Sequence, residues 1–187
     1  MIQVISLHCL NKEVQHESTG KLINFRVYED GDDLVGVADV TLPTLDAMTE
    51  TVKGAGIAGE VESPVMGHYS SMTLELNWRT LEKPNVLLSS PKGVHLDLRG
   101  AQQVWDSGEG AFIVRPVKVV VSGVPKSTEL GKLDVGTTSD TKNTIEVNYL
   151  KVTIDGENVL ELDKYNYICN IGGTDYLSDV REALGLN

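Results

Sequence analysis

Alternation of apolar and polar residues with a period of two is the feature that most constrains how this chain folds. In residues 72–79, the apolar residues Met72, Leu74, Leu76 and Trp78 occupy every second position. Successive side chains of a β-strand point to opposite faces, so this spacing predicts a strand with one buried and one solvated face. The alternation returns at residues 94–98, 117–121 and 145–149. We therefore expect most of the chain to form antiparallel sheet.

The alternation changes phase after Tyr149, because the apolar positions continue at Leu150 and Val152. A shift of one residue moves side chains to the other face of a strand, which predicts a β-bulge or a strand that leaves one sheet for another. Asp155 and Gly156 follow, and this pair is typical of a two-residue hairpin turn. The chain is therefore expected to return directly as a further strand.

Helix is expected mainly near the C-terminal end, between Thr174 and Leu184. Its apolar stripe consists of Tyr176, Leu177, Val180 and Leu184. Thr174 is predicted to cap this helix, Asp175 favours its positive N-terminus, and Gly185 suits the left-handed residue that ends it. A shorter helical turn is expected at residues 84–90.

Two long stretches, residues 46–68 and 123–143, lack such a pattern and are rich in Gly, Ser, Thr and charged residues. Connections without secondary structure that exceed about 12–15 residues are uncommon in compact domains and are usually functional or disordered. We therefore interpret both stretches as candidate arms between subunits. The whole chain, residues 1–187, is of a size suited to a single domain.

A dinucleotide-binding pattern, G-x-G-x-x-G, is matched letter for letter by residues 54–59. That pattern binds pyrophosphate only where a buried strand precedes the glycines and a helix follows them. Here mostly polar residues precede the glycines, and residues 60–64, which end in a proline, do not readily begin a packed helix. A flexible glycine loop is the better interpretation, and no cofactor is expected.

The charge balance argues against nucleic-acid binding. With 27 acidic and 16 basic residues the net charge is -11, which repels phosphate and leaves no basic stripe to release counterions. The same repulsion would let DNA pass along an acidic wall without sticking. No apolar run approaches the roughly 20 residues that span a bilayer. The chain is therefore expected to stay in the cytosol, without membrane insertion.

No arrangement of residues in the sequence indicates catalysis or metal binding. Carboxylates gather around a glycine in residues 28–33, but they lack the alternating ligands and the distal Glu of an EF-hand, so a solvated turn is expected. The four histidines lack the spacing of metal ligands, and no serine lies in a G-x-S-x-G elbow. Cys9 and Cys169 are too few for a disulfide framework and are interpreted as buried free thiols.

Several short motifs occur in a specific order along the chain. Residues 150–157 read Leu-Lys-Val-Thr-Ile-Asp-Gly-Glu and residues 159–163 read Val-Leu-Glu-Leu-Asp. Residues 170–177 read Asn-Ile-Gly-Gly-Thr-Asp-Tyr-Leu and precede the expected helix. Upstream, residues 37–43 and 72–78 flank the glycine loop. In this order the motifs resemble the major tail tube protein family of contractile-tailed phages and phage-tail-like particles, from about residue 34 onward.

The resemblance implies a mainly β fold, an antiparallel β-sandwich or open barrel with a flanking C-terminal α-helix, similar to type VI secretion tube proteins. It implies hexameric rings that stack into a hollow conduit inside a contractile sheath, for delivery of DNA or for envelope puncture. No residue would be catalytic, and residues 46–68 would form a long loop between subunits. The candidate contact residues toward the neighbouring ring are Lys53, Gly54, Gly56, Ile57, Gly59 and Glu60.

The resemblance also implies partners and a location. The partners would be other copies of the chain, the tail sheath protein, a tape-measure protein and a baseplate or tube initiator, with DNA passing through without specific binding. The location would be a virion tail or tail-like particle, assembled in the host cytoplasm.

Three alternatives stay open. One is the tube subunit of a headless bacteriocin or type VI-like injection system. Another is a carbohydrate-binding β-sandwich with Trp78 or Trp105 as a stacking platform. The last is an enzyme with a carboxylate pair, for which the sequence holds no motif.

Overall fold

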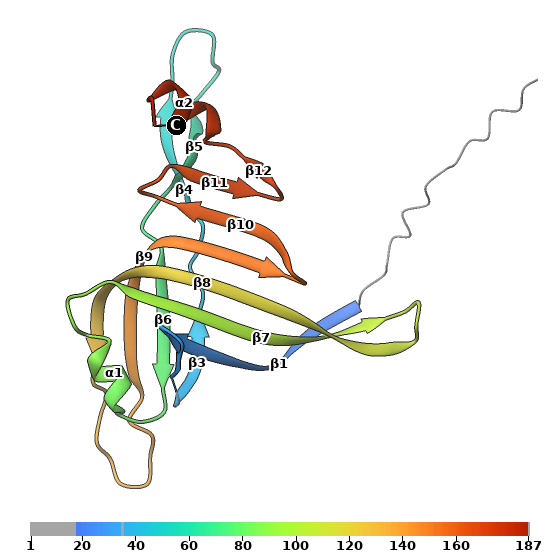
Figure 1. The fold of residues 1–187 in the computed structure, drawn as a ribbon. Coiled ribbons are helices and arrows are strands. Elements are labelled where there is room, and N and C mark those ends of the chain that lie inside the picture. The colour runs from blue at the N-terminus through green and yellow to red at the C-terminus, as the bar shows by residue number, and fades with distance from the viewer. Residues whose placement is uncertain (1–17, 35, 187) are drawn as a thin grey trace, which may run out of the picture.

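The computed structural model describes residues 18–34 and 36–186, and strands dominate the fold (Figure 1). Within these residues, ten strands join in one large antiparallel sheet. Its main path runs in the order β12 (Thr174–Asp175), β11 (Ile168–Ile171), β10 (Glu157–Asp163), β9 (Thr141–Ile154), β8 (Ala111–Glu129), β7 (Val94–Asp106), β1 (Ser18–Glu29) and β2 (Asp32–Asp33). Strand β6 (Thr73–Trp78) pairs with β9 and with β3 (Val37–Thr41). The prediction of a mainly β, antiparallel fold is confirmed.

The large sheet folds over into two layers because β8 and β9 take part in both. Residues 141–146 of β9 pair with β6, whereas residues 149–154 pair with β10. In Figure 1, β7, β8 and β10 run roughly horizontally, whereas β6 and the start of β9 run vertically. Strands that switch layers through bends are typical of sandwiches in which the two layers cross.

A β-bulge marks the point where β8 and β9 change layer, as the change of phase in the sequence predicted. Ser122 pairs with Tyr149, but the next residue, Gly123, pairs with Val147, so one residue of β9 is left without an opposite partner. A Cβ at position 123 would overlap the carbonyl oxygen of Glu146. The close approach of the two strands at the bend therefore requires glycine.

The alternating apolar residues form the core between the layers. Leu74 and Leu76 are fully buried and Trp78 is 1% exposed, while the intervening residues of β6 are half-buried. Val94 and Leu96 of β7 pack against them from the other layer. Burying each large apolar side chain stabilises the fold by about 1.5–3 kcal/mol. The predicted buried face of this strand is confirmed.

A buried polar cluster closes one end of the core around Asn143, which is 2% exposed. Asn143 Oδ1 accepts hydrogen bonds from Trp78 Nε1 at 2.8 Å and from Asn85 Nδ2 at 2.7 Å. Asn143 Nδ2 donates to the Asn85 carbonyl oxygen at 3.1 Å and to Thr128 Oγ1 at 2.9 Å. The cluster thereby satisfies this side chain and ties β6, β8 and β9 to helix α1 (Lys83–Leu87).

Within the described residues, two short helices flank the strands, and one differs from its prediction. Helix α1 overlaps the helical turn that was predicted at residues 84–90. Helix α2 (Ser178–Ala183) begins later than predicted, because Thr174 and Asp175 form β12 and pair with β11. The prediction that Thr174 caps the helix was therefore wrong. Gly185, with a φ of 69°, follows the helix in the left-handed conformation, as predicted.

Residues 46–68 and 123–143, whose sequence shows no clear alternation, consist largely of strands. The first stretch contains β4 (Ala47–Val52) and most of β5 (Val61–Tyr69), which pair as a hairpin. The second contains the end of β8 and the start of β9, leaving residues 130–140 between them. Alternation fails in β4 because the whole strand is exposed, and in β8 because shifts of register interrupt it.

Replacing Asn143 with Ala is expected to destabilise the fold by about 2–4 kcal/mol, because buried groups of Trp78 and Asn85 lose their acceptor. The measurement is chemical denaturation of the soluble subunit. Thr144→Ala is the matched control, since Thr144 is half-buried and points to the opposite face of the same strand. The control substitution should lower the free energy of unfolding by less than about 1 kcal/mol. Equal losses in the two variants would contradict the role of the cluster.

Candidate functional site

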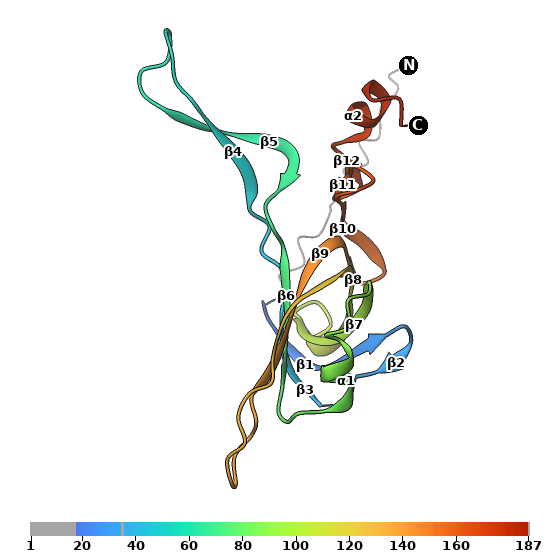
Figure 2. The ribbon, with the colours of Figure 1, turned by 90° about the vertical axis from the view of Figure 1, so that its left-hand side faces the viewer.

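The β4–β5 hairpin projects away from the sandwich (Figure 2). Every residue of β4 and the first six residues of β5 are exposed. Apolar side chains lie in the open, with Val61 53% and Met66 55% exposed. An isolated two-stranded hairpin is marginally stable in water, and exposed apolar patches mark interaction sites. The hairpin is therefore the best candidate for a surface that another chain covers.

The register of the hairpin sets which residues share a face. Val52 lies opposite Val61, so these side chains are neighbours on one face. Thr51 lies opposite Glu62 on the other face. One face of the hairpin thus carries an apolar pair next to the tip, and the other face is polar there.

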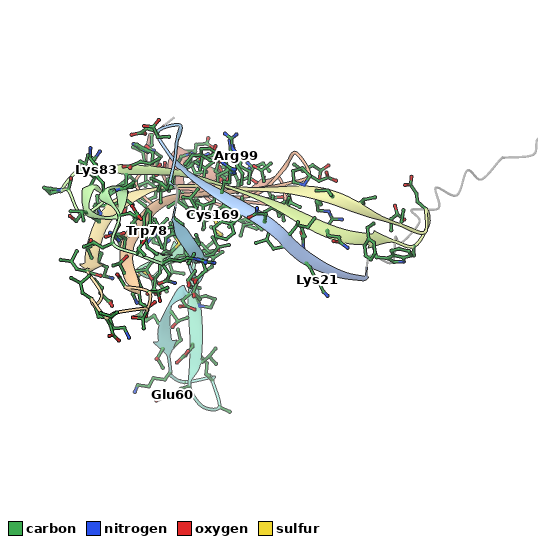
Figure 3. The ribbon with its side chains drawn as sticks, turned by 90° about the horizontal axis from the view of Figure 1, so that it is seen from below. Lys21, Glu60, Trp78, Lys83, Arg99 and Cys169 are labelled. Carbon is green, nitrogen blue, oxygen red and sulfur yellow. The ribbon has the colours of Figure 1, made fainter. Side chains whose placement is uncertain are left out.

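The glycine loop that the sequence singled out forms the tip of this hairpin. The six predicted contact residues lie together there: Lys53, Gly54, Gly56, Ile57, Gly59 and Glu60. Lys53 Nζ lies 3.4 Å from Glu60 Oε1, and the Ile57 N–H donates to the Gly54 carbonyl oxygen at 3.2 Å. Figure 3 shows Glu60 at this tip, far from Trp78 in the core. An exposed strand stands on each side of the glycines, so the dinucleotide-binding context is absent from this hairpin and the loop interpretation is confirmed.

The base of the hairpin is held against the C-terminal part of the chain. Gly67 has a φ of 69°, and a Cβ at this position would lie 2.6 Å from Leu177 Cγ. The Ser70 N–H donates to the Asp46 carbonyl oxygen at 2.9 Å. Lys164 Nζ in turn donates to the Ser70 carbonyl oxygen at 2.9 Å. These contacts fix the direction in which the hairpin projects, and the sequence pattern gave no signal for them.

A second projection is the outer part of the β7–β8 hairpin, residues 101–116 (Figure 1). The rings of Trp105 and Phe112 pack edge to face, with centroids 4.9 Å apart. Phe112 and Val114 are each 63% exposed and alternate along one face. Sequence reasoning named Trp105 as a possible stacking platform and missed this exposed apolar face, although the spacing of Phe112 and Val114 was a visible signal.

Of the two tryptophans named for carbohydrate binding, Trp78 is buried in the core, whereas Trp105 is half-buried against Phe112. Trp78 is 1% exposed and donates its indole N–H to Asn143, so it is not a stacking platform. No group of three His, Cys, Asp or Glu side chains in residues 18–34 and 36–186 is placed to hold a metal ion. Residues 28–33 form the predicted turn, between β1 and β2.

Cys169 is buried and free, as predicted, whereas Cys9 lies outside the described residues. Among the helices that the structure describes, none has the length and apolar character needed to cross a membrane.

Comparison with known proteins shows the family of the chain. The model of the family described as phage tail tube protein FII matches residues 19–185. The chain belongs to this family. The tail tube protein of Escherichia phage P2 is 30% identical over 173 residues, which cover 89% of this chain and 96% of that protein. A chain from the structure of the PVC sheath/tube terminator of an extracellular contractile injection system covers 70% of this chain and 94% of its own length, at 14% identity and a TM-score of 0.46.

Membership of the family confirms the resemblance drawn from the order of the sequence motifs. The chain is therefore a structural subunit of a tail tube, in a phage tail or a tail-like particle. The hairpin and the arm of β7 and β8 are the parts of this tail tube protein that project from the sandwich with exposed apolar side chains.

A polar cluster on the surface of the tube subunit joins β9 and β10. Glu161 accepts hydrogen bonds from Tyr149 OH and Asn158 Nδ2, each at 2.8 Å, and lies 3.2 Å from Lys151 Nζ. Burial opposes ionisation, but these partners outweigh it and hold the pKa of Glu161 below its ordinary value. Burial and the adjacent carboxylate raise the pKa of Tyr149 to about 12. When Glu161 is ionised, the cluster stabilises the pairing of β9 with β10.

A Gly67→Ala substitution is expected to loosen the base of the hairpin, because the new Cβ meets Leu177 and the residue must keep a positive φ. The expected result is faster proteolysis within residues 47–66 and a stability loss of about 1–3 kcal/mol. Gly54→Ala is the matched control, because a Cβ there meets nothing within 4 Å. Unchanged proteolysis of the Gly67 variant would show that this contact does not anchor the hairpin.

The stability of the subunit is expected to fall as the pH is lowered from about 5 to about 3. A carboxyl group whose folded pKa is depressed stabilises the fold above its unfolded pKa, about 4.3 for Glu, and loses this contribution as the pH falls through the folded value. Glu161→Gln should flatten this dependence in denaturation midpoints measured across the pH range. Glu109→Gln, in the exposed turn between β7 and β8, is the control. Identical slopes in the two variants would refute the assignment.

Proposed function

We propose that the chain, as a single domain, assembles into hexameric rings that stack into a hollow tube. The observation that carries this proposal is the β4–β5 hairpin, which has apolar side chains in the open and a base held by Gly67 and Leu177. Such a hairpin gains stability when a neighbouring chain covers it. The contact is heterologous, and repeated heterologous contacts close into rings or extend as stacks.

Open strand edges support the assembly of rings. Among the described residues, β3 pairs with β6 alone, and β1 pairs with β2 only at Tyr28 and Glu29. The remaining backbone groups along these edges are available to a strand of another copy, since exposed edges readily pair between chains. Pairing of this kind would continue the sheet from one subunit to the next around the ring.

The tip of the hairpin is proposed to contact the neighbouring ring. Its contact residues are those predicted from the sequence, Lys53, Gly54, Gly56, Ile57, Gly59 and Glu60. Fixing a flexible residue costs about 1–2 kcal/mol, and the paired strands and the ion pair between Lys53 and Glu60 reduce the number of residues that must be ordered on contact.

The tube is proposed to act as a passive conduit inside a contractile sheath. Its partners would be the sheath protein, a tape-measure protein and a baseplate or tube initiator, and assembly would take place in the host cytoplasm. DNA would pass through without specific binding, which the net charge of -11 supports because it repels phosphate. No residue is assigned a catalytic role.

Electron microscopy of the purified protein tests the proposal. Negative-stain images of fresh and concentrated samples are expected to show hexameric rings and stacked hollow tubes. A uniform monomer under every condition would overturn self-assembly of the chain.

The same experiment includes a variant in which residues 53–60 are replaced by an Asn-Gly turn, which removes the tip but keeps a hairpin. This variant is expected to form rings that stack poorly, because the ring contact and the stacking contact use different surfaces. Asp155→Asn, in the turn between β9 and β10, is the control and should form tubes of normal length. Normal tubes without the tip would refute its role in stacking.

A further inference from the structure

An apolar groove with a volume of about 380 Å³ opens between β1 and β3, over β7 and β8. Its walls include Leu22, Phe25, Val40, Leu42 and Val117. Leu22 and Leu42 are 58% and 49% exposed, so the groove leaves apolar surface of the sandwich in contact with water. Apolar side chains left open to water in one concave place suit contact with apolar groups of another chain.

The groove exists because β1 and β3 diverge. The Leu34 N–H still donates to the Val27 carbonyl oxygen at 2.8 Å, but β3 then pairs with β6 while β1 follows β7. Among the described residues, the outer edge of β3 pairs with no strand, and the outer edge of β1 pairs only with the short β2. The groove therefore has apolar side-chain walls, which suit the apolar side chains of a hairpin, while the open backbone edges stay with the contact proposed within the ring.

The groove and the hairpin lie at opposite ends of the molecule. In Figures 1 and 2 the β4–β5 hairpin extends upward, whereas β1 and β3 lie at the lower end of the sandwich. Figure 3, seen from below, has β1 with Lys21 in front of β7 and β8. Copies stacked in the same orientation would bring the hairpin of one toward the groove of the next.

The two ends differ in their balance of charge. Residues 18–28 of β1 contain Lys21 and Arg26 and no acidic residue. Arg99 also lines the groove, and its guanidinium pairs with Asp97 at 2.7 Å; Asp39 lines it too and accepts a hydrogen bond from Asn77 at 2.6 Å. The hairpin carries the opposite balance, with Glu50, Glu60 and Glu62 against Lys53. In a chain of net charge -11, strand β1 beside the groove is thus more basic than the hairpin, and this difference favours an approach of the hairpin to it.

We propose that this groove receives the hairpin of the copy stacked next to it along the tube. The apolar pair Val52 and Val61, with Ile57 at the tip, packs against the walls near Leu22 and Leu42. This assignment rests on the proposed stacking of rings and names the surface that accepts the contact.

Cysteine cross-linking in assembled tubes tests the assignment. Ile57→Cys is combined with Leu22→Cys in a chain that also carries Cys9→Ala, while the buried Cys169 is retained. A disulfide forms only where the Cα atoms come within about 7 Å. Tubes are collected by sedimentation, oxidised and separated by denaturing electrophoresis without reductant. The expected result is loss of the monomer band and a ladder of multimers that continues beyond the hexamer.

Two further pairs sharpen the test. Val61→Cys with Leu42→Cys probes the opposite wall and replaces the first pair if that variant fails to assemble. Ile57→Cys with Phe112→Cys is the matched control, because Phe112 is exposed but lies outside the groove, and it should stay monomeric on the gel.

Each other outcome counts against the assignment in a distinguishable way. A ladder that stops at the hexamer would place the hairpin within its own ring and overturn the contact between rings. If tubes form but neither cysteine pair in the groove cross-links, the groove is not the acceptor of the hairpin. Another segment or partner would then occupy it. Absence of tubes from the unsubstituted chain would overturn the proposed function itself.

Discussion

Hydrogen bonding between β8 and β9 is the interaction on which the rest of the fold depends, because each of these strands belongs to both layers. Strands β7 and β1 attach through β8, whereas β10, β11, β12, β6 and β3 attach through β9. The pair bends at Gly123, where a side chain would overlap a backbone carbonyl group of β9. Both crossed layers thus extend from the hydrogen-bonded pair of β8 and β9. Gly123, which has no side chain, permits the bend in this pair.

Stability and assembly draw on different parts of the chain. The residues that alternate with a period of two fill the core, and the cluster around Asn143 closes one end of it. The hairpin and the arm of β7 and β8 instead leave apolar side chains in water. These exposed apolar groups lie outside the core, so they do not disturb its packing. Removing them from water makes association with other copies favourable.

Sequence reasoning succeeded where one face of a strand is buried and failed where both faces are exposed. Strand β6, the bulge between Val147 and Tyr149 and the turn at Asp155 all follow from apolar spacing and turn chemistry. Strands β4 and β5 carry no such spacing, since no core selects one face. Thr174 was misassigned because Asp175 binds Arg181 at 2.6 Å and the Cys169 N–H at 3.2 Å, tertiary contacts that favour β12. The groove and the anchor at Gly67 join distant segments, which no local pattern reveals.

The hairpin is continuous with the central strands, since β3 leads into β4 and β5 leads into β6. Strand β6 pairs with β9 at every position from Thr73 to Trp78 and with β3 on its other side. A pull on the tip would therefore act lengthwise on β6 and load its ladder to β9 in shear. Bonds loaded in shear share the force, whereas bonds that are peeled fail one after another. The subunit is built to carry tension from its tip into its core without unzipping.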